Sequence, residues 1–264
     1  MYFRPVHTDL HLPTLYKFIQ TNPLGILTTA IPSSKYNTIQ SSHIPWILDL
    51  PPPSDPDPDP DSPPPNARLR GHMALANPHV KALIEAATAS GSNTLTEDVM
   101  ILFNGPAHHY ITPKFYVETK PATGKVVPTW NYTAVQVYGT ATVHFDTSMP
   151  ETGTFISMAI ADLSRQSEEG IFGFDGKEGR PGPWSVGEAP EAYVALLSRA
   201  IVGVEVEVKS VAGKFKMNQE LGVGDRVGVI EGFEKLGTDL GREMARTVRE
   251  RGELKDRLAL ESKA

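Results

Sequence analysis

His72 is the residue of this sequence whose type and surroundings point most directly to metal chemistry. It follows Gly71 at the end of a segment with strand character, and Asn77 and Pro78, a favoured helix cap and a favoured first helical residue, come soon after it. Neutral imidazole is the best transition-metal and haem ligand among the residue types present, and Gly71 would let a flat ligand approach the backbone closely. We therefore place His72 and Asn77 at a candidate cofactor site, with His72 as an axial ligand. The alternative is a core or turn histidine bonded to a carbonyl group.

A second group of candidates consists of Thr129, Trp130 and Asn131, which stand directly before the clearest strand pattern of the chain. A hydroxyl, a large ring and an amide at one strand end suit a planar cofactor, which needs stacking area and a few placed polar groups. The alternative is a core tryptophan with turn-forming neighbours. Lys216 and Gln219 follow another strand and could bind a phosphate or carboxylate, although such a run is usually a solvated turn.

Several kinds of site are excluded by residues that the sequence lacks. It contains no cysteine, which excludes thiolate zinc sites, iron–sulfur clusters, cysteine nucleophiles and disulfides. The zinc-hydrolase pattern H-E-x-x-H, the nucleophile elbow G-x-S-x-G and the glycine-rich phosphate motifs are also absent. His108 and His109 are adjacent on a predicted strand, so they point to opposite faces and cannot serve one site. Any metal must therefore be held by histidine or carboxylate.

The elements that must position these residues are read from the apolar periodicity. Helical spacing predicts a short helix from about residue 12 that ends before Asn22, and further helices begin at Asn77 or occupy about 150–167, 190–200 and 237–260. Strand patterns cover 24–31, 44–50, 67–76, 100–103, 110–112, 135–145 and 202–208. Strands with hairpin-length links predict an α+β chain, an antiparallel barrel with peripheral helices.

The length and composition fit one large or two small domains, and we expect one soluble globular domain over residues 1–264. The chain is 40% apolar and 21% charged, and residues 51–65 form a Pro/Asp-rich segment that we expect to be a solvated, disordered loop. With a net charge of -6, the chain lacks the excess of basic residues that unassisted DNA binding usually requires. We therefore expect no direct nucleic-acid partner. Without a signal peptide or a run of 18 apolar residues, we expect a cytoplasmic protein with no membrane partner.

Six ordered segments of the chain resemble PaiB-type proteins, which are described as FMN-binding negative transcriptional regulators. The segments are MYFRPVH, SSHIPW, GHMALANPHV, FNGPAHHYITPKFY, VPTWNYTAVQVYG and KFKMNQE, and the resemblance runs from Met1 to about Gly232. It implies the antiparallel split β-barrel of flavin-binding oxidases. It also implies a homodimer with cofactor sites at the subunit interface.

Residues 71–79 are similar to the G-H-M-x-x-A-N-P-H segment of the haem-dependent piperazate synthases within this family. These enzymes close N5-hydroxyornithine, a small amino acid, into the cyclic hydrazine piperazic acid, and the resemblance implies haem b bound through His72. Trp130 and Asn131 would line the pocket, and Lys216 or Gln219 would hold the substrate carboxylate. Met217 and Asn218 depart from the family's F-K-L-S-Q-E stretch, which leaves the substrate open. The alternatives are an FMN-binding or haem-binding regulator of transcription and a flavin-dependent oxidoreductase.

Overall fold

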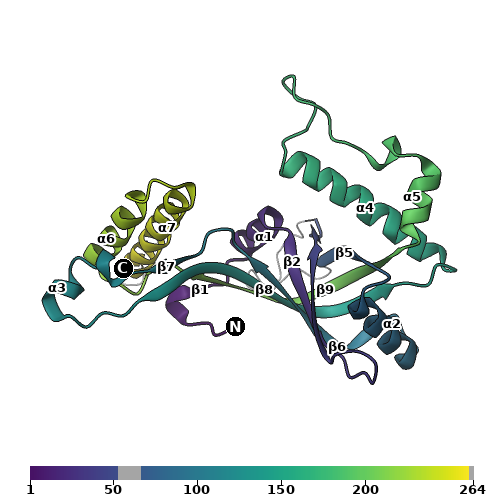
Figure 1. The fold of residues 1–264 in the computed structure, drawn as a ribbon, viewed down its shortest axis with the longest axis horizontal. Helices are drawn as coiled ribbons and strands as arrows, with labels where there is room; N and C mark the ends of the chain where they lie inside the picture. The colour runs from purple at the N-terminus through teal and green to yellow at the C-terminus, as the bar shows by residue number, and fades with distance from the viewer. Residues whose placement is uncertain (53–66, 262–264) are drawn as a thin grey trace. The chain divides into compact units, whose positions relative to one another are not determined.

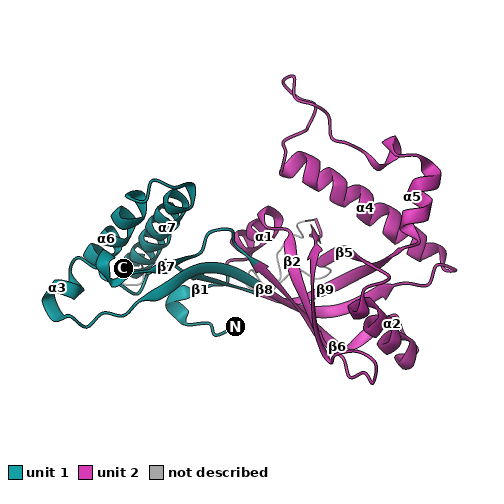
Figure 2. Ribbon diagram, in the orientation of Figure 1, with its two compact units in different colours: residues 1–10, 104–135, 212–264 teal, residues 11–103, 136–211 magenta. Residues whose placement is uncertain are grey.

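The computed structural model describes residues 1–52 and 67–261, so the predicted Pro/Asp loop lies outside the described residues except at Pro51 and Pro52. The chain forms two compact units (Figure 2). Unit 1 contains residues 1–10 and 104–135 and the chain from 212 onward, and unit 2 contains residues 11–103 and 136–211. Two long strands, β8 (Thr129–His144) and β9 (Ile201–Lys216), contribute to both units.

The strands belong to one antiparallel sheet, nine-stranded in the described part of the chain. They are β1 (Thr8–Asp9), β2 (Leu24–Ala30), β3 (Ile39–Pro45), β4 (Ile47–Asp49), β5 (Arg68–Ala74), β6 (Thr94–Asn104), β7 (His109–Ile111), β8 (Thr129–His144) and β9 (Ile201–Lys216). In unit 2 the order is β3-β2-β6-β8-β9-β5-β4. In unit 1, β7 pairs with the first part of β8 and β1 pairs with the last part of β9.

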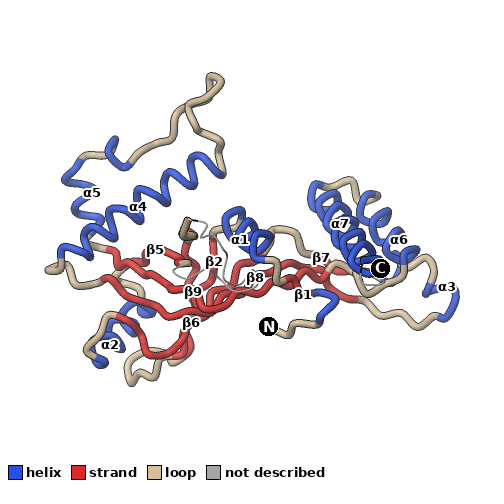
Figure 3. Tube along the Cα trace, turned by 180° about the vertical axis from the view of Figure 1, so that it is seen from behind, coloured by secondary structure: helices blue, strands red, loops and turns tan. Residues whose placement is uncertain are grey.

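The helices lie around the strands (Figures 1 and 3). They are α1 (Leu12–Thr21), α2 (Pro78–Ser90), α3 (Thr119–Thr123), α4 (Pro150–Gly170), α5 (Glu191–Ser198), α6 (Val223–Glu234) and α7 (Asp239–Glu261). Single 3-10 turns occupy η1 (Pro5–His7), η2 (Pro113–Phe115) and η3 (Val186–Glu188). The α+β class, with an antiparallel sheet and peripheral helices, is confirmed. Within the described residues, none of these helices has the length and apolar character needed to cross a membrane.

Local signals explain where several of these elements begin and end. The Asn77 side chain accepts a hydrogen bond from the backbone N–H of His79 at 2.9 Å and so caps α2, and Gly91 ends that helix in the left-handed conformation. The strand predicted over 44–50 is divided into β3 and β4 at Trp46. The backbone N–H of Trp46 donates to the Pro23 carbonyl at 2.9 Å, and its ring is buried.

Each unit has a hydrophobic core of its own. In unit 2 the core is formed by the inward-facing side chains of the strands, including Leu27, Leu69, Ile101, Val137 and Val204. In unit 1 it is formed by the α6–α7 pair together with β7 and the end of β9, including Ile111, Met217, Phe233, Met244 and Val248. Helix α7 occupies the segment where a charged C-terminal helix was predicted.

Candidate functional site

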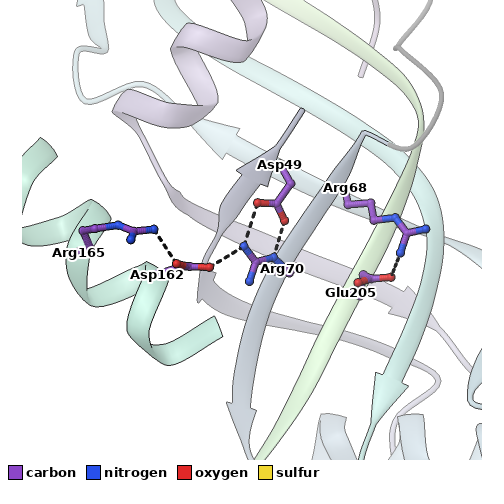
Figure 4. A network of polar contacts seen from close by, with 6 residues as sticks. All are labelled: Asp49, Arg68, Arg70, Asp162, Arg165 and Glu205. Carbon is purple, nitrogen blue, oxygen red and sulfur yellow. Dashed lines mark hydrogen bonds and ion pairs between the residues drawn. The ribbon is translucent and has the colours of Figure 1, made fainter. Parts of the chain in front are cut away.

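Strand β5 places His72 on the outer face of the unit 2 sheet, away from the core. Its side chains alternate strictly, and Arg68, Arg70 and His72 form the half-buried set. Arg70 donates to Asp162 of α4 at 2.9 Å and forms two hydrogen bonds with Asp49 of β4 (Figure 4). These ion pairs hold α4 over the face that carries His72. The hydrogen bonds with Asp49 raise the pKa of Arg70 above its ordinary value, so the guanidinium group stays charged.

The imidazole of His72 is half-buried, and burial lowers its pKa from the ordinary value of 6.5. Its Nδ1 atom is fully buried and has no hydrogen-bond partner among the described residues. The ring is therefore neutral at physiological pH and has no side-chain partner that competes for it. Those are the properties that a metal-ligating histidine needs.

Gly71 has a different role from the one predicted for it. A Cβ atom at this position would lie 2.7 Å from the Ile44 side chain and 3.2 Å from the Trp46 ring. The glycine therefore faces the core of unit 2, because successive residues of a strand point to opposite faces. It makes room for the buried tryptophan and not for a ligand beside His72.

The outer face continues across β9 onto β8. Gly203 of β9 pairs with His72, and a Cβ atom at Gly203 would lie 3.2 Å from the Cβ atom of His144 on β8. The ring of Phe155 from α4 stacks on His144 with 3.8 Å between the ring centroids. Burial lowers the pKa of His144 as well, and its Nε2 atom is buried without a partner in the described part of the chain. Sequence reasoning missed His144 and Phe155, because the only signal at His144 is its alternation with apolar neighbours.

Asn77 is engaged in structural contacts in this arrangement. Besides capping α2, its side chain donates to Ser42 Oγ at 3.3 Å. The neighbouring His79 is 1% exposed and is bonded at both ring nitrogens, to Thr29 Oγ1 at 2.8 Å and to Ser42 Oγ at 3.0 Å. Burial lowers its pKa to about 4. This polar cluster orients the start of α2 after the segment that holds His72, and a direct role of Asn77 in cofactor binding stays a prediction.

The other predicted site residues lie in unit 1. Thr129, Trp130 and Asn131 are the first residues of β8 and not residues before it, so their side chains alternate between faces. Trp130 is 55% exposed, whereas Asn131 is fully buried and its Nδ2 atom donates to Asn218 Oδ1 at 2.5 Å. Trp130 lies edge-on to Tyr110, which pairs with it on β7. The ring and the amide of this segment therefore face different surroundings.

Lys216 is brought together with Thr129 and Trp130. Its ammonium group donates to Thr129 Oγ1 and, at 2.6 Å, to the carbonyl oxygen of Trp130, and burial lowers its pKa. The Gln219 side chain folds back on its own turn, where it accepts a hydrogen bond from the backbone N–H of Met217 at 2.7 Å and donates to the Phe215 carbonyl. The Lys216 ammonium group is thus bonded to the start of β8 beside an exposed ring, while the Gln219 amide stabilises the turn after β9.

Metal binding by a cluster of side chains is not supported in the described part of the chain, where no three histidine or carboxylate side chains gather around one point. Haem would bring the other iron ligands with it, so a single histidine such as His72 could hold it. Of the seven residues predicted from the sequence, His72 and Asn77 lie in unit 2, and Thr129, Trp130, Asn131, Lys216 and Gln219 lie in unit 1.

Comparison with known proteins relates the chain to a family of FMN-binding domains. Residues 1–210 match the family described as "Putative FMN-binding domain". An uncharacterized protein of Aspergillus fumigatus is 56% identical over 264 residues, which cover 97% of this chain and 100% of that protein. Protease synthase and sporulation protein PAI 2 of Bacillus subtilis is 27% identical over 177 residues, which cover 67% of this chain and 70% of that protein.

Among solved structures, the FAD and heme binding protein from Mycobacterium smegmatis aligns with 80% of this chain and 73% of its own chain. The TM-score is 0.43 and the sequence identity is 11%.

Proposed function

The chain belongs to this FMN-binding domain family, and from that premise we propose that it binds a planar cofactor at His72 of unit 2. Haem b is the cofactor that the site favours, and FMN is the alternative that the family description favours. His72 would hold the haem iron through its imidazole. Bound haem would supply an iron centre that acts as a Lewis acid.

The observation that carries the choice of haem is the state of the His72 imidazole. A haem ligand must be neutral, must be reachable on one side and must not be consumed by other hydrogen bonds. His72 is half-buried, burial lowers its pKa, and no side-chain hydrogen bond to it occurs within the described residues. His79, in the first turn of the helix that Asn77 caps, is by contrast bonded at both nitrogens and enclosed. Of these two imidazoles, His72 alone meets the requirement.

The reaction that we propose is the cyclisation of N5-hydroxyornithine to piperazic acid, which rests on the similarity of residues 71–79 to the piperazate synthases. In this reaction the α-amine attacks N5, an N–N bond forms, the N–O bond breaks, and the oxygen leaves as water. The change is redox-neutral, so it needs no oxidant or reductant. A site that holds the substrate in a curled conformation, with its two nitrogens in contact, can lower the activation free energy by roughly 7 to 11 kcal/mol in favourable cases.

A homodimer whose cofactor site takes residues from both chains is part of the same proposal. Static light scattering of the cofactor-loaded protein should give twice the 28.8 kDa of one chain. A monomer with full cofactor occupancy would remove this part of the proposal and leave the assignment of His72 in place.

The first experiment tests the cofactor by titrating the purified protein with hemin and, separately, with FMN. We expect a Soret band with saturable hemin binding, its loss in His72→Ala, and its return when free imidazole is added to that variant. His43→Ala removes an exposed imidazole of the same unit and serves as the matched control, which should bind as the wild type does. An unchanged Soret band in His72→Ala, with native circular dichroism, contradicts the ligand assignment, and saturable binding of FMN alone selects the flavin alternative.

The second experiment tests the reaction in the hemin-loaded protein. N5-hydroxyornithine should be converted to a product lighter by one water, detected by mass spectrometry and compared with authentic piperazic acid. The His43→Ala variant should retain turnover and His72→Ala should lose it. A wild-type protein that binds hemin normally and never converts the substrate rejects the reaction while the cofactor assignment stands.

A further inference from the structure

Three neighbouring strands of unit 2 place two histidines on either side of a glycine. His72 on β5 pairs with Gly203 on β9, and the Cβ atom of His144 on β8 lies 3.2 Å from where a Cβ of Gly203 would stand. Paired and adjacent residues of an antiparallel sheet share a face, and strands are spaced about 4.8 Å apart, so the two histidines stand roughly 10 Å apart on the outer face. Gly203 leaves the sheet surface between them without a side chain.

The ring of Phe155 lies over this glycine. A Cβ atom at Gly203 would come within 2.5 Å of two ring atoms of Phe155, and the same ring is stacked on His144 with an interplanar angle of 12°. The Phe155 side chain is half-buried, so one part of it faces solvent. The flat ring of Phe155 therefore occupies the space above Gly203, with its edge toward Gly203 and its face toward the His144 ring.

We propose that the face of the His144 ring is a second binding surface for the planar cofactor. Phe155 acts as a gate: its ring occupies this surface when the cofactor is absent and must move away for the cofactor to bind. This inference rests on the proposed binding of a planar cofactor at His72, and it adds two residues, His144 and Phe155, to the site. Entry of the cofactor exchanges one flat ring for another against His144. The gate makes binding depend on the displacement of Phe155 as well as on the ligand.

His144 is suited to stacking because its ring is neutral and already packed. Burial lowers its pKa, and its Nε2 atom is buried without a partner among the described residues. Two arginines of the same face are paired with carboxylates, since Glu205 accepts from Arg68 at 2.6 Å and Arg70 is bound by Asp49 and Asp162. A neutral aromatic surface thus lies between His72 and the end of β8.

The start of α4 has features that allow Phe155 to move while the rest of the helix stays in place. Met149 provides no side-chain cap, and Gly153 is exposed in the first turns with no atom within 4 Å of its would-be Cβ. Packing therefore does not require glycine at this position, and glycine loosens a helix relative to alanine. Farther along the helix, Asp162 is anchored to Arg70. Thr152 and Ile156 hold one face of the first turns by packing, and the exposed face that carries Gly153 has no such contact.

The test is a stopped-flow measurement of hemin binding to two variants with opposite expected effects. Phe155→Ala removes the gate and should speed hemin association several-fold. Gly153→Ala stiffens the first turns and should slow association by up to about fivefold if opening unwinds that residue, because alanine is favoured over glycine by roughly 1 kcal/mol in a helix. Met158→Ala shortens an exposed side chain of the same helix and should leave the rate unchanged.

The role of His144 is measured by the rate at which bound hemin passes to an excess of apomyoglobin. His144→Ala should release hemin several-fold faster than the wild type, with native circular dichroism. Association rates that are unchanged in Phe155→Ala and Gly153→Ala, or a release rate that is unchanged in His144→Ala, would overturn the proposal.

The His72→Ala variant separates this inference from the ligand assignment. If His72→Ala retains an unaltered Soret band while Phe155→Ala and Gly153→Ala change the rate in opposite directions, the ligand assignment is wrong and the gate is supported.

Discussion

The histidines of unit 2 differ in how their ring nitrogens are satisfied. His79 is enclosed and bonded to Thr29 and Ser42, whereas His72 and His144 each have one buried nitrogen without a partner in the described part of the chain. A buried imidazole with both nitrogens bonded stabilises a fold, and one with an unmet nitrogen is destabilised until something else meets it. This difference is why His79 is interpreted as structural and the other two as site residues.

The depressed pKa of His79 predicts that acid destabilises the protein before the carboxylates titrate. The folded pKa is about 4 and the ordinary value is 6.5, so the unfolded chain takes up the proton first as the pH falls. Between pH 6.5 and about pH 5 this group should lower the free energy of unfolding by about 2 kcal/mol. His72 and His144 act in the same direction, because burial lowers their pKa values as well.

Urea unfolding at a series of pH values measures this loss of stability. His79→Gln retains a side chain that can bond to Thr29 and Ser42 but removes the titration, so its free energy of unfolding should depend less steeply on pH than that of the wild type. His43→Gln, at an exposed position, should reproduce the wild-type slope. Equal slopes in all three proteins would show that His79 does not remain neutral in the folded state.

At the residue scale, the sequence predicted which residues are unusual better than where their side chains point. Thr129, Trp130 and Asn131 were expected as a group, but the strand begins at Thr129 and alternation separates the exposed ring from the buried amide. The pairing of His144 with Phe155 was not predictable, because it joins the end of β8 to a helix face. Sequence spacing carries no information about such a contact.

Among the helices, α6 shows how glycine spacing determines packing. Gly224, Gly228 and Gly232 recur every four residues and so lie on one helix face. A Cβ atom at Gly228 would lie 2.2 Å from the Phe115 carbonyl oxygen, and one at Gly232 would lie 2.4 Å from the Phe115 ring. The glycines therefore allow the η2 turn to lie directly against α6.

Alanine substitutions at two helical glycines should consequently have opposite effects on stability. Gly228→Ala forces a methyl group against a backbone oxygen that cannot move like a flexible side chain, so it should destabilise unit 1 by about 3 kcal/mol. Gly153→Ala meets no neighbour and should stabilise the chain by up to about 1 kcal/mol. Thermal and urea unfolding midpoints measure both changes, and a neutral Gly228→Ala would show that α6 shifts to accept the methyl group.

The sequence predicted most elements because their periodicity is regular and their caps are explicit. The helices after Asn77 and over 150–167 and the long strands at 135 and 202 are present with shifted ends. Helix α6 was missed because its glycines weaken helix propensity and its apolar side chains are not confined to one face, since the glycine face itself packs. The break at Trp46 was missed because it depends on the Pro23 carbonyl, which is distant in sequence.

The charge distribution of the whole chain bears on whether it acts on DNA. The net charge is -6 over the full sequence, and Asp55, Asp57, Asp59 and Asp61 account for four of the negative charges, so the remainder has -6 + 4 = -2. Many arginines are paired with carboxylates, as Arg70, Arg226, Arg246 and Arg251 are. Paired arginines are not free to neutralise phosphates, and the affinity of proteins for duplex DNA depends mainly on such contacts.

We therefore predict that the hemin-loaded protein does not bind duplex DNA with useful affinity at physiological salt. Non-specific binding by proteins with free cationic surfaces has a Kd of about 10⁻⁴ to 10⁻⁶ M, and this chain should fall at or beyond the weak end of that range. Fluorescence anisotropy with mixed-sequence and promoter-derived duplexes, repeated over a salt series, measures both the affinity and its salt dependence. Because a direct transcriptional regulator needs tight, salt-dependent binding to a specific site, nanomolar affinity for one duplex would favour the regulator over the enzyme. Flat anisotropy across all duplexes, with hemin binding intact, is the result that an enzyme of this charge should give.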